Sequence, residues 1–318
     1  MQNNFNNQNE SQNQNEITEK QKQEFSILIE SIKLKLALLL AKNLYTSFNI
    51  INRQIIDYYN NNDLNVINFI VKAKDIVENN KNLITADLQK QFVKAIDIAK
   101  DVDNNYFNKN KTKLKPSEKD LLYANERATK QTKIIAENLN KAHLEIYTKA
   151  DEIYQEFRNA KSFKELKSIN EFKNLSKKMK NLLKKNFEKT QEQFETVKEK
   201  NTLLKEAKKE IFKDKIVKNT KTRISKTSYY EVAATIEKTR FDTSKEQDKK
   251  QKIWIAKLDD KTRHTHFEAD GKTQNINEAF QIRNPTNNGI ELLMHPGDTS
   301  LGASLNNVIA CRCLSIYI

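Results

Sequence analysis

The sequence predicts a mainly α-helical protein in which a long N-terminal helical bundle or hairpin precedes a small C-terminal α+β domain. All four glycines lie after residue 270, and Pro116 is the only proline before residue 285. Glycine and proline mark sharp turns, so a stretch almost without them is typical of long helices. Both cysteines, the single tryptophan and three of the four histidines lie after residue 250. We therefore divide the chain into an extended helical region, 21–222, and a tightly turned domain, 223–318.

The first segment, 1–20, is a polar run rich in Asn and Gln. Such a run cannot bury enough apolar surface to offset its ordering entropy, so we expect a disordered tail. Beyond it, over 25–59, apolar residues recur at the spacing of a helix. They are Phe25, Leu28, Ile29, Ile32, Leu36, Leu39 and Leu40.

Turn and capping residues then divide the helical region. Residues 60–63 predict a turn, with Asp63 as the N-cap of a helix that starts at Leu64. Helical patterning appears again near Ala86 and pauses over the polar stretch 104–115. The sequence Pro116-Ser117-Glu118 is a start signal for the next helix, because proline suits the first helical turn.

A long amphipathic helix is predicted from Phe163 onwards. Its apolar residues keep three- and four-residue steps and need a partner helix to cover them. They are Phe163, Leu166, Ile169, Phe172, Leu175, Met179 and Leu182. Residues 229–249 predict one more charged helix, 252–256 a strand by their alternation, and 307–318 a final strand.

The chain is strongly basic, with a formal net charge of +14. Between Lys161 and Lys226 there are 21 Lys and Arg against 9 Asp and Glu, a net charge of +12. A helical face this basic attracts polyanions, which would be DNA or an acidic partner rather than a membrane surface. The alternative is a solvated Lys-rich face with no partner.

The cysteine count and the hydropathy pattern predict a soluble intracellular protein. Two cysteines separated by one residue cannot make a disulfide framework, which favours a reducing compartment. The N-terminus lacks the apolar core of a signal peptide. The most apolar stretch, 34–41, is flanked and broken by lysines and is too short to span a membrane.

Histidines and cysteines of the C-terminal domain form a candidate metal site. Alternate residues of a strand face the same side, so Cys311 and Cys313 would present both sulfurs together, and His264 and His266 have the same spacing. Two thiolates with one or two imidazoles suit a tetrahedral zinc ion, with His295 as a further candidate. A single structural zinc is therefore expected. The alternative is that the thiols are packing residues and the histidines surface groups.

The same region carries an ordered series of motifs. They are Ala234-Thr235-Ile236-Glu237, Trp254, Asp259, Thr262-Arg263, His266, Asp270-Gly271, Asn277-Glu278-Ala279-Phe280, Pro296-Gly297-Asp298 and Cys311-Arg312-Cys313. This series resembles the phage Mu F-like, SPP1 gp7-type family of minor head (head morphogenesis) proteins. The chain has Ala310 where the family usually has Asn, and His295 where it usually has an aromatic residue. The resemblance favours His266 among the histidines.

The resemblance implies a low-copy structural protein inside a phage or prophage head. Its expected partners are the portal protein and other head proteins, and its expected location is the virion and, during assembly, the host cytoplasm. Catalysis is not expected, because no nucleophile elbow, phosphate loop or paired carboxylates frame the histidines. A metal-dependent hydrolase or nuclease remains the alternative, and a DNA-binding protein without a base-reading motif a third.

Individual residues of the series have expected structural roles. We expect Trp254 in the core and Asp259 as a cap or turn residue in the following loop. Arg263 and Asp298 could form an ion pair that ties the Pro296-Gly297-Asp298 turn to the first strand.

Overall fold

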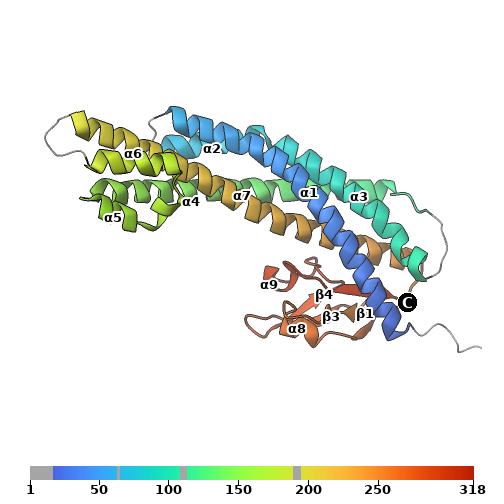
Figure 1. Ribbon diagram of the computed structural model, residues 1–318. Helices are drawn as coiled ribbons and strands as arrows, with labels where there is room; N and C mark the ends of the chain where they lie inside the picture. The colour runs from blue at the N-terminus through green and yellow to red at the C-terminus, as the bar shows by residue number, and fades with distance from the viewer. Residues whose placement is uncertain (1–16, 63–64, 108–112, 189–194) are drawn as a thin grey trace, which may run out of the picture. The chain divides into compact units, whose positions relative to one another are not determined.

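The computed structural model describes residues 17–62, 65–107, 113–188 and 195–318 (Figure 1). Helices dominate up to residue 246: α1 (Glu19–Asn61), α2 (Val66–Asn79), α3 (Lys81–Phe107), α4 (Glu118–Asn159), α5 (Phe163–Ser168), the 3-10 helix η1 (Asn170–Asn174), α6 (Lys177–Glu188) and α7 (Glu195–Glu246). The remainder consists of short elements: β1 (Gln251–Ile255), α8 (His264–Phe267), β2 (Thr273–Asn275), β3 (Phe280–Arg283), β4 (Ile290–Leu293), α9 (Leu305–Val308) and β5 (Leu314–Tyr317). The predicted fold class is confirmed.

Caps define where the helices begin. Ser117 and Asp120 form a reciprocal capping box at the start of α4, as the Pro116-Ser117-Glu118 signal predicted. The cap of α2 is Asn65, whose side chain accepts a hydrogen bond from the Asn68 amide. Asp63, the expected cap, and residues 1–16 of the expected tail lie outside the described residues. The first described helix starts at Glu19.

The predicted long helix from Phe163 is wrong in its continuity. The chain is helical over α5, η1 and α6, and it leaves the helical conformation at Ile169 (ψ 127°) and Leu175 (ψ 150°). Serine side chains cap the two α-helical pieces: Ser162 accepts from the Glu165 amide and Ser176 from the Met179 amide. A cap stabilises a new helix start locally, and periodicity alone does not register it.

The apolar stripe over 163–188 is nevertheless core, as predicted. Leu166, Phe172, Leu175 and Leu183 are buried in one cluster with residues of α4 and α7, and Phe163 packs against it. The interrupted segment therefore still packs its apolar residues into a core. The exception is Leu182, which is 38% exposed.

The expected charged helix over 229–249 is the end of α7, a single helix of 52 residues. Its charged side chains at Glu231, Glu237 and Arg240 are buried. Buried charges need partners, so this part of α7 is a packing surface and not a solvated face.

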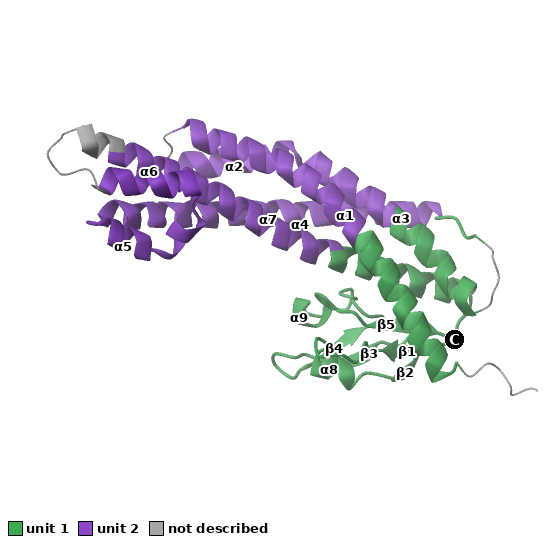
Figure 2. Ribbon diagram, viewed as in Figure 1, with its two compact units in different colours: residues 1–37, 94–116, 229–318 green, residues 38–93, 117–228 purple. Residues whose placement is uncertain are grey.

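The chain forms two compact units, and each is discontinuous in sequence (Figure 2). The first contains the described residues of 1–37, 94–116 and 229–318, and the second those of 38–93 and 117–228. The domain boundary expected at residue 222 falls inside α7. The unit that holds all strands therefore also includes the start of α1 and the ends of α3 and α7.

In the described residues of the second unit every regular element is a helix. Its core includes stacked aromatic rings, with Phe69 on Tyr147 and Tyr59 on Phe212. No helix in the described residues is long and apolar enough to cross a bilayer.

The strands of the first unit form two small antiparallel sheets. One has the order β2-β1-β5, and β3 pairs with β4 in the other. Trp254 in the central strand β1 lies opposite Ser315 of β5 and is completely buried. Its ring contacts Phe280 at 5.3 Å between centroids. The expected core role of Trp254 and the strand over 252–256 are confirmed.

The expected strand over 307–318 is shorter than predicted. Residues 305–308 form the helical turn α9, and β5 begins only at Leu314. Between them Ala310 adopts a left-handed conformation with φ 55°. The Cys311-Arg312-Cys313 segment therefore precedes the strand and lies outside it.

Candidate metal centre

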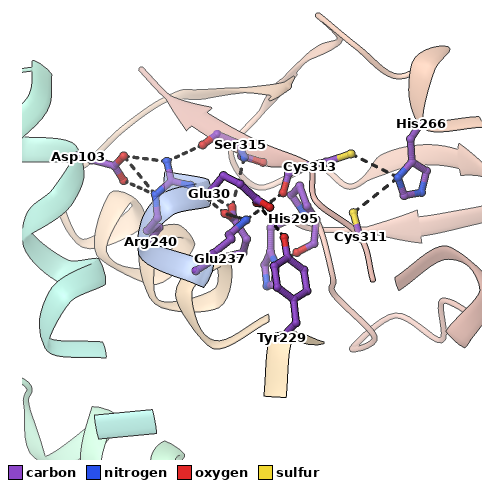
Figure 3. Close-up of polar contacts among 12 residues, drawn as sticks. Glu30, Asp103, Tyr229, Glu237, Arg240, His266, His295, Cys311, Cys313 and Ser315 are labelled. Atoms are coloured by element: carbon purple, nitrogen blue, oxygen red, sulfur yellow. Dashed lines mark hydrogen bonds and ion pairs between the residues drawn. The ribbon is translucent and has the colours of Figure 1, made fainter. Parts of the chain in front are cut away.

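Three buried side chains converge beside the three-stranded sheet of the first unit. The Nδ1 atom of His266 lies 3.6 Å from the Cys311 sulfur and 3.4 Å from the Cys313 sulfur. Figure 3 shows the imidazole facing both sulfurs. The ligand atoms of the three residues all lie within 4.8 Å of one another. This arrangement confirms that His266, Cys311 and Cys313 form a group able to hold a metal ion.

The distances fit a zinc ion. Zinc–nitrogen bonds of about 2.0–2.1 Å and zinc–sulfur bonds of about 2.3 Å at a tetrahedral angle place the nitrogen and sulfur about 3.5 Å apart. The two observed nitrogen–sulfur distances, 3.6 and 3.4 Å, bracket this value. The Nε2 atom of His266 is buried and has no hydrogen-bond partner among the described residues. Nδ1, which faces both sulfurs, is the ring nitrogen placed to bind a metal.

Local backbone structure presents these ligands. His266 lies on the single turn α8, whose first residues follow Arg263 at the N-cap position. The Arg263 guanidinium donates to the carbonyl oxygen of Ile309, so it ties α8 to the segment that leads into the cysteines. Ala310 then takes its left-handed conformation and redirects the chain toward Cys311. Both sulfurs reach one side of the imidazole through this turn and not through strand alternation.

The other two predicted ligands are not part of the group. His264 is on α8, where residues two apart point in different directions, and its side chain is 86% exposed and beside Glu268. The expectation that His264 and His266 share a strand face was therefore wrong. His295 is buried elsewhere, with Nδ1 3.1 Å from the Pro296 carbonyl and its ring against Phe241. Within the described residues the group has three protein ligands.

The two thiols are electrostatically unequal. The hydrogen bond from Cys313 to the Cys311 sulfur, together with His266, lowers the pKa of Cys311 well below its ordinary value. The same hydrogen bond and burial raise the pKa of Cys313 well above its ordinary value. A cation bound by both sulfurs would take the place of the proton in this hydrogen bond.

Space beside the sulfurs is small. A cavity of about 10 Å³ lies between the cysteines and α7, lined among others by Tyr230, Ala233 and Gly297. This is room for roughly one water molecule. Only a ligand of that size could occupy a fourth coordination position from this side.

A network of buried charges, which was not predicted from the sequence, holds the backbone at Cys313 and Ser315. Lys33 of α1 is 1% exposed, donates to the Cys313 carbonyl oxygen at 3.1 Å and pairs with Glu237 at 2.8 Å. Arg240 pairs with Glu237 and Asp103 and donates to the Ser315 carbonyl at 2.7 Å (Figure 3). The network therefore binds the backbone carbonyl groups of Cys313 and Ser315.

Position within the helix stripe could have revealed Lys33. It lies four residues after Ile29 and three before Leu36, on the face that the core buries. A lysine on a buried stripe needs a specific anionic or carbonyl partner. The same reasoning applies to Glu237, which lies four residues after Ala233 and four before Phe241, both of them buried. Burial alone would raise the pKa of Glu237, but Lys33 and Arg240 outweigh burial and hold the pKa below its ordinary value.

The turn motifs act on the backbone around the centre. Asp259 accepts from the Lys261 amide and the Thr262 hydroxyl, so its expected turn role is confirmed. Asp259 also pairs with Arg312, the residue between the two cysteines in the sequence. The Arg312 Nη1 atom lies 2.6 Å from the Asp259 Oδ2 atom. The carboxylate of Asp270 accepts from the Ala256 amide at 2.7 Å. Gly271 has φ 73°, a conformation that glycine adopts without strain.

The Pro296-Gly297-Asp298 turn is held by the side chain of its own aspartate. Asp298 accepts hydrogen bonds from the amides of Met294 and Ser300. Gly297 has φ 80°, and a side chain there would approach Ala234 of α7. The expected ion pair between Arg263 and Asp298 is not what these residues form, because Arg263 donates to the Ile309 carbonyl. The turn is therefore fixed by hydrogen bonds from backbone amides to the Asp298 carboxylate.

Comparisons with family models, curated proteins and solved structures find no match. The chemistry of this centre and the motif series around it are therefore what bears on function.

Proposed function

We propose that this protein is a structural minor head protein of a phage or prophage, with a C-terminal unit fastened by one zinc ion at His266, Cys311 and Cys313. It would act in head morphogenesis beside the portal protein. The observation that carries the proposal is that the motif residues cluster in space. Three of them form the metal centre, and Asp259, Arg263 and Asp298 fix the turns around it.

A zinc ion would supply cross-linking here. The small sheets offer few core residues, and a metal bound by α8 and by the segment before β5 would join parts of the chain that are far apart in sequence. His266 would give its Nδ1 lone pair, and both cysteines would bind as thiolates. Lys33, whose ammonium donates to the Cys313 carbonyl, would offset part of the negative charge that two thiolates bring.

A metal-dependent hydrolase or nuclease is the second candidate. It is favoured by the three-ligand group, because catalytic zinc sites use three protein ligands and leave one position open. Against it, all three ligands are buried and the neighbouring cavity holds only about one water. A nucleic-acid substrate needs far more access, so we favour the structural centre.

The basic helical region would contact packaged DNA or an acidic partner. In the second unit a shallow groove of about 560 Å³ runs between α4 and α7. Its basic lining residues are Lys149, Lys215, Lys218, Arg223 and Lys226. Acidic neighbours pair with some of them, such as Glu152 with Lys149. A groove with this surplus of cations suits the phosphates of a nucleic acid without reading its sequence.

Elemental analysis tests the metal. We expect about one zinc per chain in the purified protein, lost in Cys311→Ser. His264→Ala is the matched control, because it removes an exposed histidine of the same short helix and should keep the zinc. A folded wild-type protein without metal, or zinc retained in Cys311→Ser, contradicts the centre.

Mass spectrometry of purified heads from the producing cell tests the role. The protein should be present in few copies in heads and procapsids and absent from isolated tails. If it is absent from heads yet cleaves nucleic acid with a metal dependence that His266→Ala abolishes, the hydrolase replaces this proposal.

A further inference from the structure

Helix α1 reaches the metal centre through one side chain. Lys33 is separated from Cys313 by 280 positions, yet its ammonium donates to the Cys313 carbonyl oxygen at 3.1 Å. The same ammonium lies 2.8 Å from the Glu237 carboxylate, and both side chains are only 1% exposed. A lysine can make three hydrogen bonds, and two of them are committed here to fixed partners.

The segment after the cysteines is held from α7 as well. Glu237 accepts from the Ser315 amide at 3.3 Å, and Arg240 donates to the Ser315 carbonyl at 2.7 Å. Together with Lys33, these side chains hold three backbone groups within three consecutive residues. Cys313 is therefore fixed through its main chain, while its sulfur faces His266.

We propose that Lys33 and Glu237 are positioning residues for the metal centre, and that metal binding and the docking of residues 25–37 of α1 are coupled. This inference rests on the zinc centre proposed above. The two side chains hold the Cys313 backbone where its sulfur meets Nδ1 of His266. A bound metal in turn holds Cys313, and with it the acceptor that Lys33 needs.

Coupling of this kind is reciprocal. If docking of α1 raises metal affinity by some factor, metal must strengthen docking by the same factor. Outer groups that orient a ligand typically change metal affinity by about 10- to 100-fold. Lys33 without the Cys313 carbonyl would keep one partner, Glu237, in a site closed to water. Breaking the hydrogen bond between Lys33 and the Cys313 carbonyl would therefore destabilise the buried lysine as well as the position of Cys313.

The experiment is a competition titration of Co²⁺ against a chromophoric chelator, followed by the thiolate-to-cobalt absorption. Lys33→Met removes the donor and keeps an apolar stem of similar length. Asp103→Asn is the control, because Asp103 belongs to the same ion network through Arg240 and touches neither Cys313 nor Ser315 in the contacts described. We expect Co²⁺ affinity to fall about 10- to 100-fold in Lys33→Met and less than about threefold in Asp103→Asn.

The outcomes separate the two proposals. If the wild type binds no Co²⁺, the metal centre itself is refuted, and this inference with it. If the wild type binds Co²⁺ and both variants bind it equally well, the centre stands and the positioning role is overturned.

Hydrogen exchange on the wild type provides a second measurement that does not depend on a folded variant. Removing the metal with a chelator should speed amide exchange in residues 25–37 more than in 38–61 of the same helix. Equal exchange of residues 25–37 with and without metal would overturn the coupling.

Discussion

Replacing Arg240 with methionine is the most direct perturbation of the ion network. The side chain has no exposed surface and donates to three groups: the carboxylates of Asp103 and Glu237 and the carbonyl of Ser315. Methionine keeps most of the length of the side chain and removes every donor. The variant therefore removes one cation from two carboxylates and one donor from the Ser315 carbonyl.

The stability lost in Arg240→Met can be worked from the partners that Glu237 and Asp103 keep. Removing one member of a buried ion pair typically costs about 3–5 kcal/mol. Glu237 keeps Lys33 at 2.8 Å, and the side chain of Asp103 is 20% exposed, so water reaches it. Both facts reduce the penalty. We therefore expect the free energy of unfolding to fall by about 3 kcal/mol, at the lower end of that range.

Urea unfolding at pH 7, followed by Trp254 fluorescence and by helical circular dichroism, measures this loss. In the double variant Arg240→Met/Asp103→Asn one of the stranded carboxylates is neutral, so the combined loss should be smaller than the sum of the two single losses. A loss below about 1 kcal/mol in Arg240→Met would refute the reasoning, because it would mean that the buried charges need no cation. Strict additivity of the two substitutions would also count against it.

The wild type should also show the pH dependence of this network. Lys33 and Arg240 hold the pKa of Glu237 below its ordinary value of 4.5, so the ionised form is favoured in the folded state. Its contribution to stability is then present above pH 4.5 and is lost as the pH falls through the folded-state pKa. Glu237→Gln should lose this part of the acid sensitivity.

Three further predictions concern other parts of the chain. Ala310→Gly should raise the free energy of unfolding by about 0.5–1 kcal/mol, because φ 55° strains alanine and not glycine; a lower urea midpoint would contradict this. Burial lowers the pKa of His143 to about 4, so its folded state disfavours the proton and stability should fall between about pH 6.5 and 4, a slope that His143→Gln removes. Gel shifts should show DNA binding without sequence preference, and Lys218→Gln/Lys226→Gln should lower the salt slope by up to about 0.9 for each phosphate that the variant no longer neutralises. Absence of any shift at about 50 mM salt and micromolar protein would leave the groove as a solvated face.

The helical body and the residues of the candidate metal group could be predicted from the sequence. Helices depend on local residue types, so the near absence of glycine and proline before residue 250 was sufficient. The start of α4 after Pro116 was visible for the same reason. Cys311 and Cys313 were identifiable because few residue types bind zinc, and the family resemblance favoured His266 among the three histidines of the same short domain.

The way these ligands meet depended on tertiary structure. A two-residue spacing predicts a shared face only on a strand, whereas His264 and His266 lie on a helical turn and the cysteines follow a left-handed bend at Ala310. Local sequence does not decide between these conformations in such short segments. The helix breaks at Ile169 and Leu175 were hidden for a similar reason, because the apolar period continues through them.

The ion network was decided by tertiary structure alone. Lys33, Asp103 and Arg240 lie on three different helices, and each is an ordinary charged residue in its own segment. Sequence determined that the helices would have apolar stripes and that a Cys/His group would lie near the end of the chain. Which buried cation would face which carboxylate or carbonyl was set only when distant segments packed together, because a charge withdrawn from water depends on partners that lie nearby in space and not in sequence.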